Sequence, residues 1–418
     1  MVIVFALLAA AVLAVLVLGH WYVWRRLVRD TTRGPGPARR TGTAVFVAGP
    51  LLMAGALVAE RSGAPFWLQR TLAWPGFLWM ALALYLLVAV VAGEVVRPLL
   101  GRLLARRVRT TETLVREPET VPAAPRPSPD EPEPAGQAPR GTNAPSRRLF
   151  VSRVVGGAAA AAAVGTVGHG TYGVLRGPRV KRVTVPLTRL PRAAHGFRIA
   201  VVSDIHLGPV LGRGFAQRVV DTVNATQPDL IAVVGDLVDG SVKDLGPAAA
   251  PLAQLTARHG AYFVTGNHEY FSGAEQWVAE VRTLGLHPLE NAHTELPYFD
   301  LAGVNDLQGE SEGQGPDFAK ALGDRDPARA CVLLAHQPAQ IHEAVRHGVD
   351  LQLSGHTHGG QLWPGNLIAA AANPTVAGLE RYGDTQLYVS RGAGAWGPPT
   401  RVDAPSDVTV IELAATRA

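Results

Sequence analysis

Five apolar segments in the second half of the chain are each followed by residues that can bind a metal ion or transfer a proton. The motifs are SDIH, GDLVD, GNHE, AHQP and SGHTH. One such motif is weak evidence, because an aspartate that ends a strand commonly caps a turn and a histidine close to proline commonly lies in an ordinary loop. Five of them in one chain are hard to attribute to turn chemistry. Their chemically active residues are Asp204, His206, Asp236, Asp239, Asn267, His268, Glu269, His336, His356 and His358.

The apolar segments that precede these motifs predict buried strands. They cover residues 197–204, 228–236, 261–267, 330–336 and 349–356, and further strands are expected at 387–392 and 407–413. Segments 214–227 and 250–258 have helical spacing. Alternating strands and helices indicate an α/β domain with a sheet that is covered on both faces. Because ligands bind at the carboxyl ends of strands in such a sheet, the five loops are expected to converge on one crevice.

The donor atoms indicate which ions this crevice binds. Carboxylate, amide oxygen and imidazole without thiolate favour manganese, iron or zinc over a structural zinc cage, with manganese the first expectation. The donors are too many for one tetrahedral ion and about enough for two ions that share a bridging carboxylate. Two ions ~3.5–4 Å apart activate a water molecule and hold the attacking and leaving oxygens of an in-line phosphoryl displacement. The sequence therefore predicts two divalent metal ions.

The five motifs, in this order from Ser203 to His358, resemble the signature of the calcineurin-like metallophosphoesterase family. The resemblance implies an α/β fold, a two-sheet sandwich with flanking helices. The apolar runs described below predict an all-α transmembrane region before it. It implies two sets of metal ligands that share Asp236. The first set is Asp204, His206, Asp236 and His358, and the second is Asp236, Asn267, His336 and His356.

The same resemblance assigns roles to the remaining motif residues. His268 and the bridging Asp236 are the expected catalytic residues, and His268 would face the phosphate to stabilise charge or to protonate the leaving oxygen. Asp239 and Glu269 are expected to orient the imidazoles or the loop. Gly235, Gly266 and Gly355 would allow the tight backbone at each strand exit.

The tail of the chain resembles a narrower group within that family. GGQLWPG and LYVSRGAGAWGPP look like the membrane-linked bacterial branch, whose members often have N-terminal spans or a twin-arginine signal. VDAPSDVTVIEL departs from that branch, which tends to have a Pro-Pro-Glu run there. Trp363 and Trp396 lie in these loops, where they either line the substrate entrance or simply pack.

Composition excludes some classes of protein. The chain has 418 residues and a single cysteine, Cys331, so it forms no intramolecular disulfide and no cysteine-rich zinc site. Its net charge of +5 could suggest nucleic-acid binding. Much of that charge is arginine beside long apolar runs, where membrane topology explains it better, and we expect no nucleic-acid partner.

Three apolar runs predict membrane spans within residues 1–109. They cover about 1–24, 44–59 and 73–96. The segments after the first and third runs are rich in arginine, whereas the segment between the second and third has only Arg61 and Arg70. Because cytoplasmic loops are enriched in arginine and lysine, we expect the N-terminus to lie outside.

Two segments connect these spans to the α/β domain. Residues 110–148 contain many prolines and too few apolar residues to bury, which predicts a disordered linker. Residues 149–176 form a fourth apolar run that follows SRRLF. This run is either a plain span with a basic cytoplasmic flank or a segment that resembles a twin-arginine export signal. Either reading places the domain at 177–418 outside the cytoplasm.

These observations predict a membrane-anchored phosphoesterase that acts on a phosphomono- or phosphodiester by direct attack of metal-bound hydroxide. Its location suggests a phospholipid, a nucleotide-sugar lipid or a cell-envelope phosphoester as substrate. The alternatives are a catalytically inactive sensor or scaffold with the same fold, and an enzyme whose domain stays in the cytoplasm. Every expected ligand is present, which favours an enzyme over a scaffold.

Overall fold

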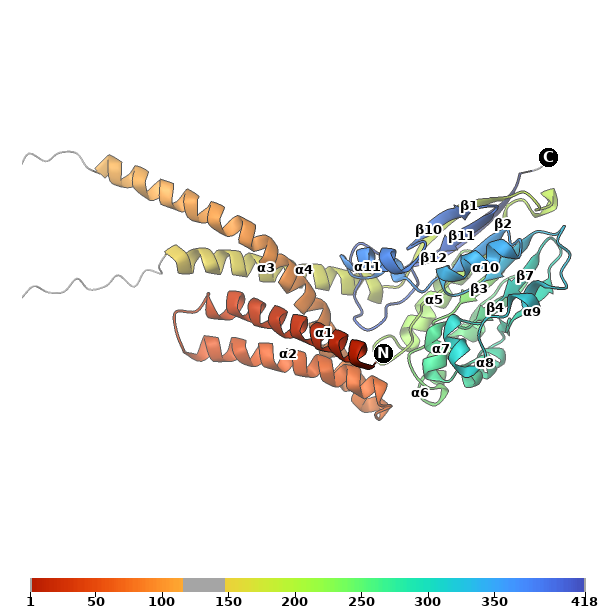
Figure 1. The fold of residues 1–418 in the computed structure, drawn as a ribbon, viewed down its shortest axis with the longest axis horizontal. Coiled ribbons are helices and arrows are strands. Elements are labelled where there is room, and N and C mark those ends of the chain that lie inside the picture. The colour runs from red at the N-terminus through yellow and green to blue at the C-terminus, as the bar shows by residue number, and fades with distance from the viewer. Residues whose placement is uncertain (1, 116–146, 417–418) are drawn as a thin grey trace, which may run out of the picture. The chain divides into compact units, whose positions relative to one another are not determined.

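The computed structural model describes residues 2–115 and 147–416 of the chain. The chain divides into two compact units, the first formed by residues 1–48 and 83–164, and the second by residues 49–82 and 165–418. Three long helices pass from one unit into the other, so the N-terminal region contributes to both. Each unit is described separately below (Figure 1).

Four helices are long and apolar enough to cross a membrane. They are α1 (Val2–Trp24), α2 (Pro37–Arg61), α3 (Phe66–Val115) and α4 (Arg147–Leu175). The segments that meet this criterion are Ala10–Arg29, Pro37–Arg61, Phe66–Leu100 and Arg147–Leu175. Helix α3 continues past residue 109 to Val115. The linker expected at 110–148 falls mostly at 116–146, which lies outside the described residues.

Hydrogen bonds from polar side chains link the helices of the first unit. A π-helical turn, η1 (Arg25–Arg29), extends α1. Nε1 of Trp24 donates to Oγ1 of Thr43 on α2 at 2.9 Å. Nε of Arg153 on α4 donates to the carbonyl of Thr31 at 2.9 Å. Polar links of this kind fix helices that the hydrophobic effect alone would not align within a bilayer.

The second unit contains two six-stranded mixed sheets. The first has the order β1-β12-β2-β3-β4-β5, and the second has the order β10-β11-β9-β8-β7-β6. The strands of the first sheet are β1 (Arg179–Leu187), β12 (Asp407–Ala415), β2 (Phe197–Val202), β3 (Leu230–Val234), β4 (Ala261–Val264) and β5 (His287–Pro288). Those of the second are β10 (Gly378–Tyr382), β11 (Thr385–Val389), β9 (Leu351–Ser354), β8 (Cys331–Leu334), β7 (Asp300–Gly303) and β6 (Ala292–Glu295). Strands β2, β3, β4 and β5 run parallel, as do β7, β8, β9 and β11.

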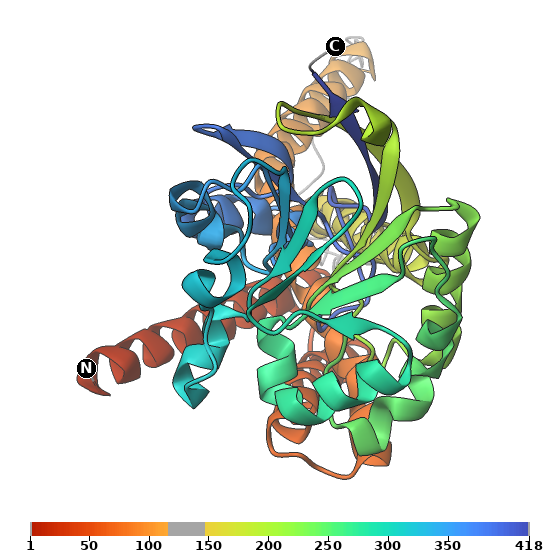
Figure 2. The ribbon, with the colours of Figure 1, turned by 90° about the vertical axis from the view of Figure 1, so that its right-hand side faces the viewer.

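Alternate side chains of each strand enter different cores. On β2, Ile199 and Val201 face the core between the sheets, whereas Ala200 and Val202 face the outer helices. On β8, Val332 and Leu334 enter the same central core, and Leu333 packs outward. Both faces of the inner strands are therefore buried, which explains the continuous apolar runs of β2, β3, β8 and β9. The sheets lie face to face with helices outside them, the sandwich that the motifs imply (Figure 2).

Helices cover the outer faces of the sheets. They are α5 (Arg213–Ala225), α6 (Val242–Ala249), α8 (Ala274–Thr283), α9 (Phe318–Leu322) and α10 (Ile341–Arg346). Helix α7 (Asn267–Ser272) follows β4, and α11 (Gly365–Ala372) has no buried residue. The helix expected at 250–258 is misplaced. Ser241 caps α6 by accepting from the backbone of Asp244, and the following 3-10 turn, Ala250–Gln254, has a proline at its start and ends the helical segment early.

Helix α4 leads into the sheet with almost no intervening chain. It ends at Leu175, and β1 begins at Arg179. Gly177, at a φ of 97°, makes the turn between them. Near the end of α4, Oγ1 of Thr171 is 2.7 Å from Oγ1 of Thr400, and the carbonyl of Gly170 accepts from the backbone of Arg401. The end of this helix is thus part of the second unit.

Candidate metal centre

The motif residues follow the carboxyl ends of five parallel strands. Strand β2 ends before Asp204 and His206, β3 ends before Asp236, and β4 ends before α7, which begins at Asn267. In the second sheet, β8 leads to His336 and β9 to His356 and His358. Both sheets therefore contribute to the same place, and the seven predicted metal ligands are brought together. They are Asp204, His206, Asp236, Asn267, His336, His356 and His358.

One group of donor atoms comes from Asp204, His206 and His358, which could hold one ion together. Nε2 of His206 and Nε2 of His358 face each other at 3.0 Å. Nε2 of His358 lies 3.3 Å from Oδ1 of Asp204. Oδ2 of Asp236 lies 3.8 Å from Nε2 of His206. Asp204, His206 and His358 are three of the four residues predicted for the first ion, and Asp236 is the fourth.

A second group comes from Asp236, His336 and His356. Nε2 of His336 is 3.1 Å from Oδ2 of Asp236. Nδ1 of His356 is 3.0 Å from Oδ1 of Asn267, which adds the predicted amide ligand. Oδ2 of Asp236 belongs to this second group and also lies 3.8 Å from Nε2 of His206 in the first group.

The backbone of this centre is strained in a way that points to function. Among the described residues, nine non-glycine residues have positive φ, and five of these are predicted ligands. The five are Asp204, His206, Asp236, His356 and His358, at φ between 50° and 71°. Left-handed backbone at residues with side chains is uncommon and costs free energy, so it concentrates where function requires a particular side-chain direction.

Close backbone approaches explain two of the predicted glycines. A Cβ on Gly355 would collide with Oγ of Ser203 and with the carboxylate of Asp204. A Cβ on Gly235, which has a φ of 74°, would meet the backbone of Gly266 and the ring of His336. Side chains at these positions would displace predicted ligands.

Comparison with known proteins identifies the family. A calcineurin-like phosphoesterase profile matches residues 197–360, the segment that contains every predicted ligand. An uncharacterized metallophosphoesterase of Helicobacter pylori is 36% identical over 272 residues, which cover 64% of this chain and 73% of that protein. The chain belongs to the calcineurin-like phosphoesterase family.

Two animal proteins similar to this chain are named as transmembrane proteins with a metallophosphoesterase domain. The protein from Danio rerio is 39% identical over 259 residues, covering 59% of each chain. The protein from Bos taurus is 40% identical over 255 residues, covering 57% of each chain. The match thus spans less than two thirds of the length of these relatives.

The donor set of the chain fits divalent metal ions. Ligation needs ionised carboxylates and neutral imidazoles. Burial raises the pKa of Asp204, but the imidazoles of His358 and His336 outweigh burial and hold it well below the usual range. Burial lowers the pKa of both His356 and His358 to about 4. Each of these groups is therefore in its metal-binding form at neutral pH.

The surroundings of His336 also support a cation-binding site. Its Nε2 is buried, points at Asp236, and has no hydrogen-bond partner within the described part of the chain. Burial would lower the pKa of His336, but the charge of Asp236 raises it well above its usual value. A divalent ion at this position would replace that proton and stabilise the buried carboxylate.

His268 lies beside the predicted ligands in an orientation suited to a phosphate. Its Nδ1 is 2.7 Å from Oδ1 of Asp239. Burial would lower the pKa of His268, but the hydrogen bond and the charge of Asp239 raise it to about 9. Asp239 therefore holds the imidazole of His268 through Nδ1. His268 also lines a cavity of ≈ 470 Å³ over the centre.

Glu269 fixes the loop that carries Asp236. Its Oε2 accepts from the backbone of Gly266 at 2.6 Å and of Asp236 at 3.0 Å, and its Oε1 accepts from Leu237 at 2.8 Å. Burial and the nearby charge of Asp236 raise the pKa of Glu269 to about 7. This buried carboxylate ties the exit of β3 to the start of α7.

The cavity has lining residues that sequence reasoning did not find. Glu60 and Arg61, from the end of α2, line it together with Phe271, Trp396 and the centre itself. The rings of His268 and Trp396 meet edge to face, with centroids 5.6 Å apart. Trp396 thus lines the cavity, one of the two roles the sequence left open, while no motif marks Glu60 or Arg61.

Arg401 is a second residue that no motif revealed. It is only 6% exposed. Its Nη1 donates to the carbonyls of His358 at 3.0 Å and Ala404 at 3.1 Å, and its Nε donates to Gly394 at 2.6 Å. The guanidinium clamps the loop of His358 to the loop that packs on Asp204. The backbone of the same arginine contacts the end of α4.

Proposed function

We propose that the chain is a membrane-anchored phosphoesterase that hydrolyses a phosphomono- or phosphodiester at a centre for two divalent ions. The observation that supports this best is the pair of ligand groups joined by Asp236. Asp204, His206, Asp236 and His358 would hold one ion, and Asp236, Asn267, His336 and His356 the other. Manganese, iron and zinc all suit this donor set, and its carboxylate and amide oxygens favour manganese.

When bound, such ions supply Lewis acidity that activates water and neutralises phosphoryl oxygens. The protein's own residues position the substrate and manage protons. His268 points its free Nε2 toward the phosphate and either stabilises the developing charge or protonates the leaving oxygen. Asp239 holds His268 and His206 in place through one oxygen.

The lining of the cavity supports a substrate held close to a membrane. Glu60 and Arg61 belong to a helix apolar and long enough to span a bilayer, yet they line the same cavity as His268. Arg61 offers a positive charge to a phosphate, while Phe271 and Trp396, 64% and 45% exposed, offer apolar surface. We infer a phosphoester joined to an apolar group, such as a phospholipid, a nucleotide-sugar lipid or an envelope phosphoester.

The distribution of arginine supports an extracytoplasmic catalytic domain. Arginines follow the first and third candidate spans and precede the fourth, as expected for the cytoplasmic side. The connection at 62–65 and the domain after α4 would then share the outer side. A reporter enzyme that is active only outside the cytoplasm, fused to the end of the full chain, tests this. An inactive fusion would overturn the orientation.

The activity is tested on the full chain in detergent with bis-p-nitrophenyl phosphate and added manganese. Asp236→Asn removes the bridging charge, and we expect activity to fall by at least ~10³-fold, because both ions lose a ligand. Asp221→Asn alters an aspartate on α5 outside the cavity and should leave the rate unchanged. Activity that survives either Asp236→Asn or a chelator would refute the two-metal proposal.

A further inference from the structure

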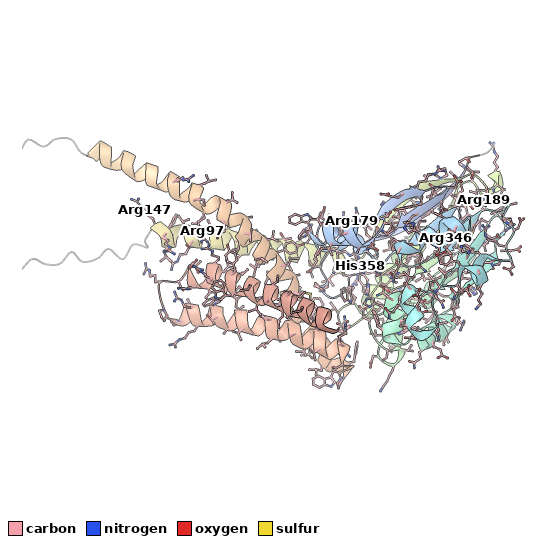
Figure 3. All side chains as sticks on the ribbon, in the orientation of Figure 1. Arg97, Arg147, Arg179, Arg189, Arg346 and His358 are labelled. Carbon is pink, nitrogen blue, oxygen red and sulfur yellow. The ribbon has the colours of Figure 1, made fainter. Side chains whose placement is uncertain are left out.

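The first unit contains a cavity that has no part in the metal centre. It has a volume of ≈ 390 Å³ and is lined by residues of η1, α3 and α4. The lining residues are Arg26, Glu94, Arg97, Arg147, Arg148, Val151 and Ser152. Figure 3 shows that Arg97 and Arg147 lie close together in this unit.

The cavity has more positive than negative charge. Glu94 is the one carboxylate in the lining, and it pairs with Arg26 at 2.9 Å and with Arg97 at 3.6 Å. Arg26 also pairs with Asp30 at 3.1 Å. Within the described residues, Arg148 has no carboxylate partner, and the buried Nε atoms of Arg26 and Arg97 have no hydrogen-bond partner. Unsatisfied guanidinium donors around a cavity indicate a site for an anion.

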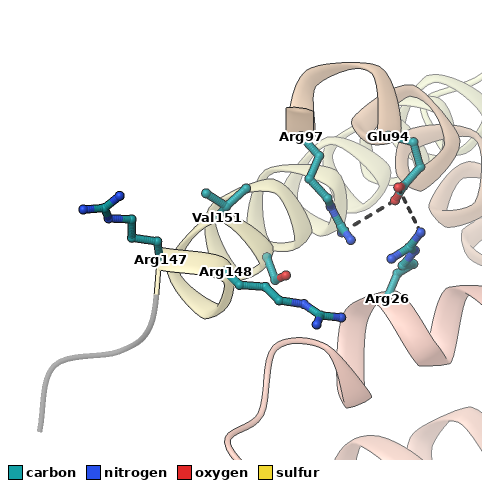
Figure 4. Close-up of a pocket in the computed structure, with 7 residues that line it drawn as sticks. Arg26, Glu94, Arg97, Arg147, Arg148 and Val151 are labelled. Carbon is teal, nitrogen blue, oxygen red and sulfur yellow. Dashed lines mark hydrogen bonds and ion pairs between the residues drawn. The ribbon is translucent and has the colours of Figure 1, made fainter. Parts of the chain in front are cut away.

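The directions of the side chains define the centre of this site. In Figure 4 Arg97 and Arg148 point into the cavity toward Arg26, whereas Arg147 points away from it. Three guanidiniums from three different helices therefore converge. Their planar donors match the oxygens of a phosphate better than a lysine would. The π-helical turn that carries Arg26 is a rare backbone form found often at functional sites.

The position of the site along the helices indicates what bears the phosphate. Arg26 and Arg97 lie near the ends of their candidate spans, and Arg148 lies at the beginning of another. The adjoining turns of the same helices expose apolar side chains, among them Val96 (52%) and Phe150 (47%). A ligand that has both a phosphate and acyl chains would fit this arrangement. Its phosphate would lie at the level of the arginines, and its acyl chains would lie along the exposed apolar side chains.

We propose that Arg26, Arg97 and Arg148 bind the phosphate of an anionic phospholipid between η1, α3 and α4. The lipid would neutralise the excess charge and join three helices at one membrane face. Basic pockets between membrane helices commonly hold anionic head groups in this way. The arginine pair that resembles an export signal would then be divided between two roles. Arg148 serves the lipid site, whereas Arg147 lines the cavity with its side chain directed away from the other arginines.

Lipid binding to the full chain in nanodiscs tests this proposal. Nanodiscs of phosphatidylcholine alone are compared with nanodiscs that also contain phosphatidylglycerol, and thermal stability and retained lipid are measured. We expect phosphatidylglycerol to raise the melting temperature of the wild type and to be retained by it. Inorganic phosphate added to phosphatidylcholine discs should not reproduce this effect, and an equal effect would overturn a lipid in favour of free phosphate.

Arg148→Gln is the decisive variant, and Arg147→Gln is its matched control with the same loss of charge one residue away. We expect Arg148→Gln to weaken phosphatidylglycerol binding about fivefold or more, and Arg147→Gln to change it much less. Both side chains are exposed, so neither change should unfold the chain, and their stability in phosphatidylcholine discs checks this. Equal losses in both variants, or no preference for phosphatidylglycerol in the wild type, would overturn the site.

Discussion

Oδ1 of Asp239 lies 2.7 Å from Nδ1 of His268. The same oxygen lies 2.9 Å from Nδ1 of His206. One carboxylate therefore orients both a predicted metal ligand and the imidazole that we propose faces the substrate. Partners of this kind hold a ligand ring in place and raise its basicity, and they matter nearly as much as the ligands themselves.

Asp239→Asn is expected to weaken two functions at once. The uncharged amide oxygen is a weaker acceptor for the two imidazoles than the carboxylate oxygen, so the manganese concentration for half-maximal activity should rise and kcat should fall, each ~10- to 100-fold. His268→Gln should lower kcat alone, because His206 keeps its partner. Manganese titrations of both variants measure the difference. An unchanged metal requirement in Asp239→Asn would contradict the shared role.

Glu269→Gln is expected to destabilise the second unit. The carboxylate accepts three backbone N–H groups, and an amide places its own N–H₂ against at least one of them. The free energy of unfolding should fall by about 1.5–3 kcal/mol. Thermal unfolding with chelator present separates this effect from metal loss. Glu275→Gln, an exposed change on α8, is the control and should shift nothing.

Arg401→Lys is expected to loosen the loop of His358. A lysine ammonium cannot span three carbonyls that a planar guanidinium reaches together. We expect manganese to bind about tenfold more weakly or worse, since the ligand loop loses its clamp. Arg381→Lys on β10, where the side chain is 67% exposed, is the matched control. Equal metal affinity in both variants would show that the clamp is dispensable.

Cys331 is expected to be inert in the folded chain. It is fully buried, and burial raises the pKa of its thiol to about 12. A thiol reagent at pH 8 should label it only at the rate of unfolding. The unfolded thiol loses its proton near pH 9 and the folded one near 12. Stability should therefore fall between these values by as much as ~1.4 kcal/mol per pH unit. Cys331→Ala should lack that slope, and rapid labelling of the native chain would contradict the burial.

The sequence predicted the strands and the residues that follow them, because in both cases a local pattern determines the position of a residue in the fold. The strand cores are continuous apolar runs, and a parallel strand delivers the residues after its carboxyl end to one edge. This is why the amino-acid pattern alone predicts that Asp204, Asp236 and His356 lie together. Strand β1 gave no such signal, because it is an edge strand that alternates between exposed and buried side chains.

Residues that reach the site from distant segments could not be predicted. Glu60 lines the cavity only because the end of α2 belongs to the second unit, and nothing in its local sequence records that association. Arg401 acts through backbone carbonyls, which every residue type offers equally. The helix expected at 250–258 lies instead at Val242–Ala249, because Ser241 supplies an N-cap before it and only a 3-10 turn follows at Ala250–Gln254.

Strand β12 lies between β1 and β2 and is hydrogen-bonded to both. It is also translated after every other strand of the two sheets. The ribosome has therefore made all four long helices, and the strand that leaves α4, before the partner of that strand exists. Biogenesis of this protein then has a built-in order: β1 waits unpaired beside the end of α4 until residues 407–415 emerge and close the first sheet.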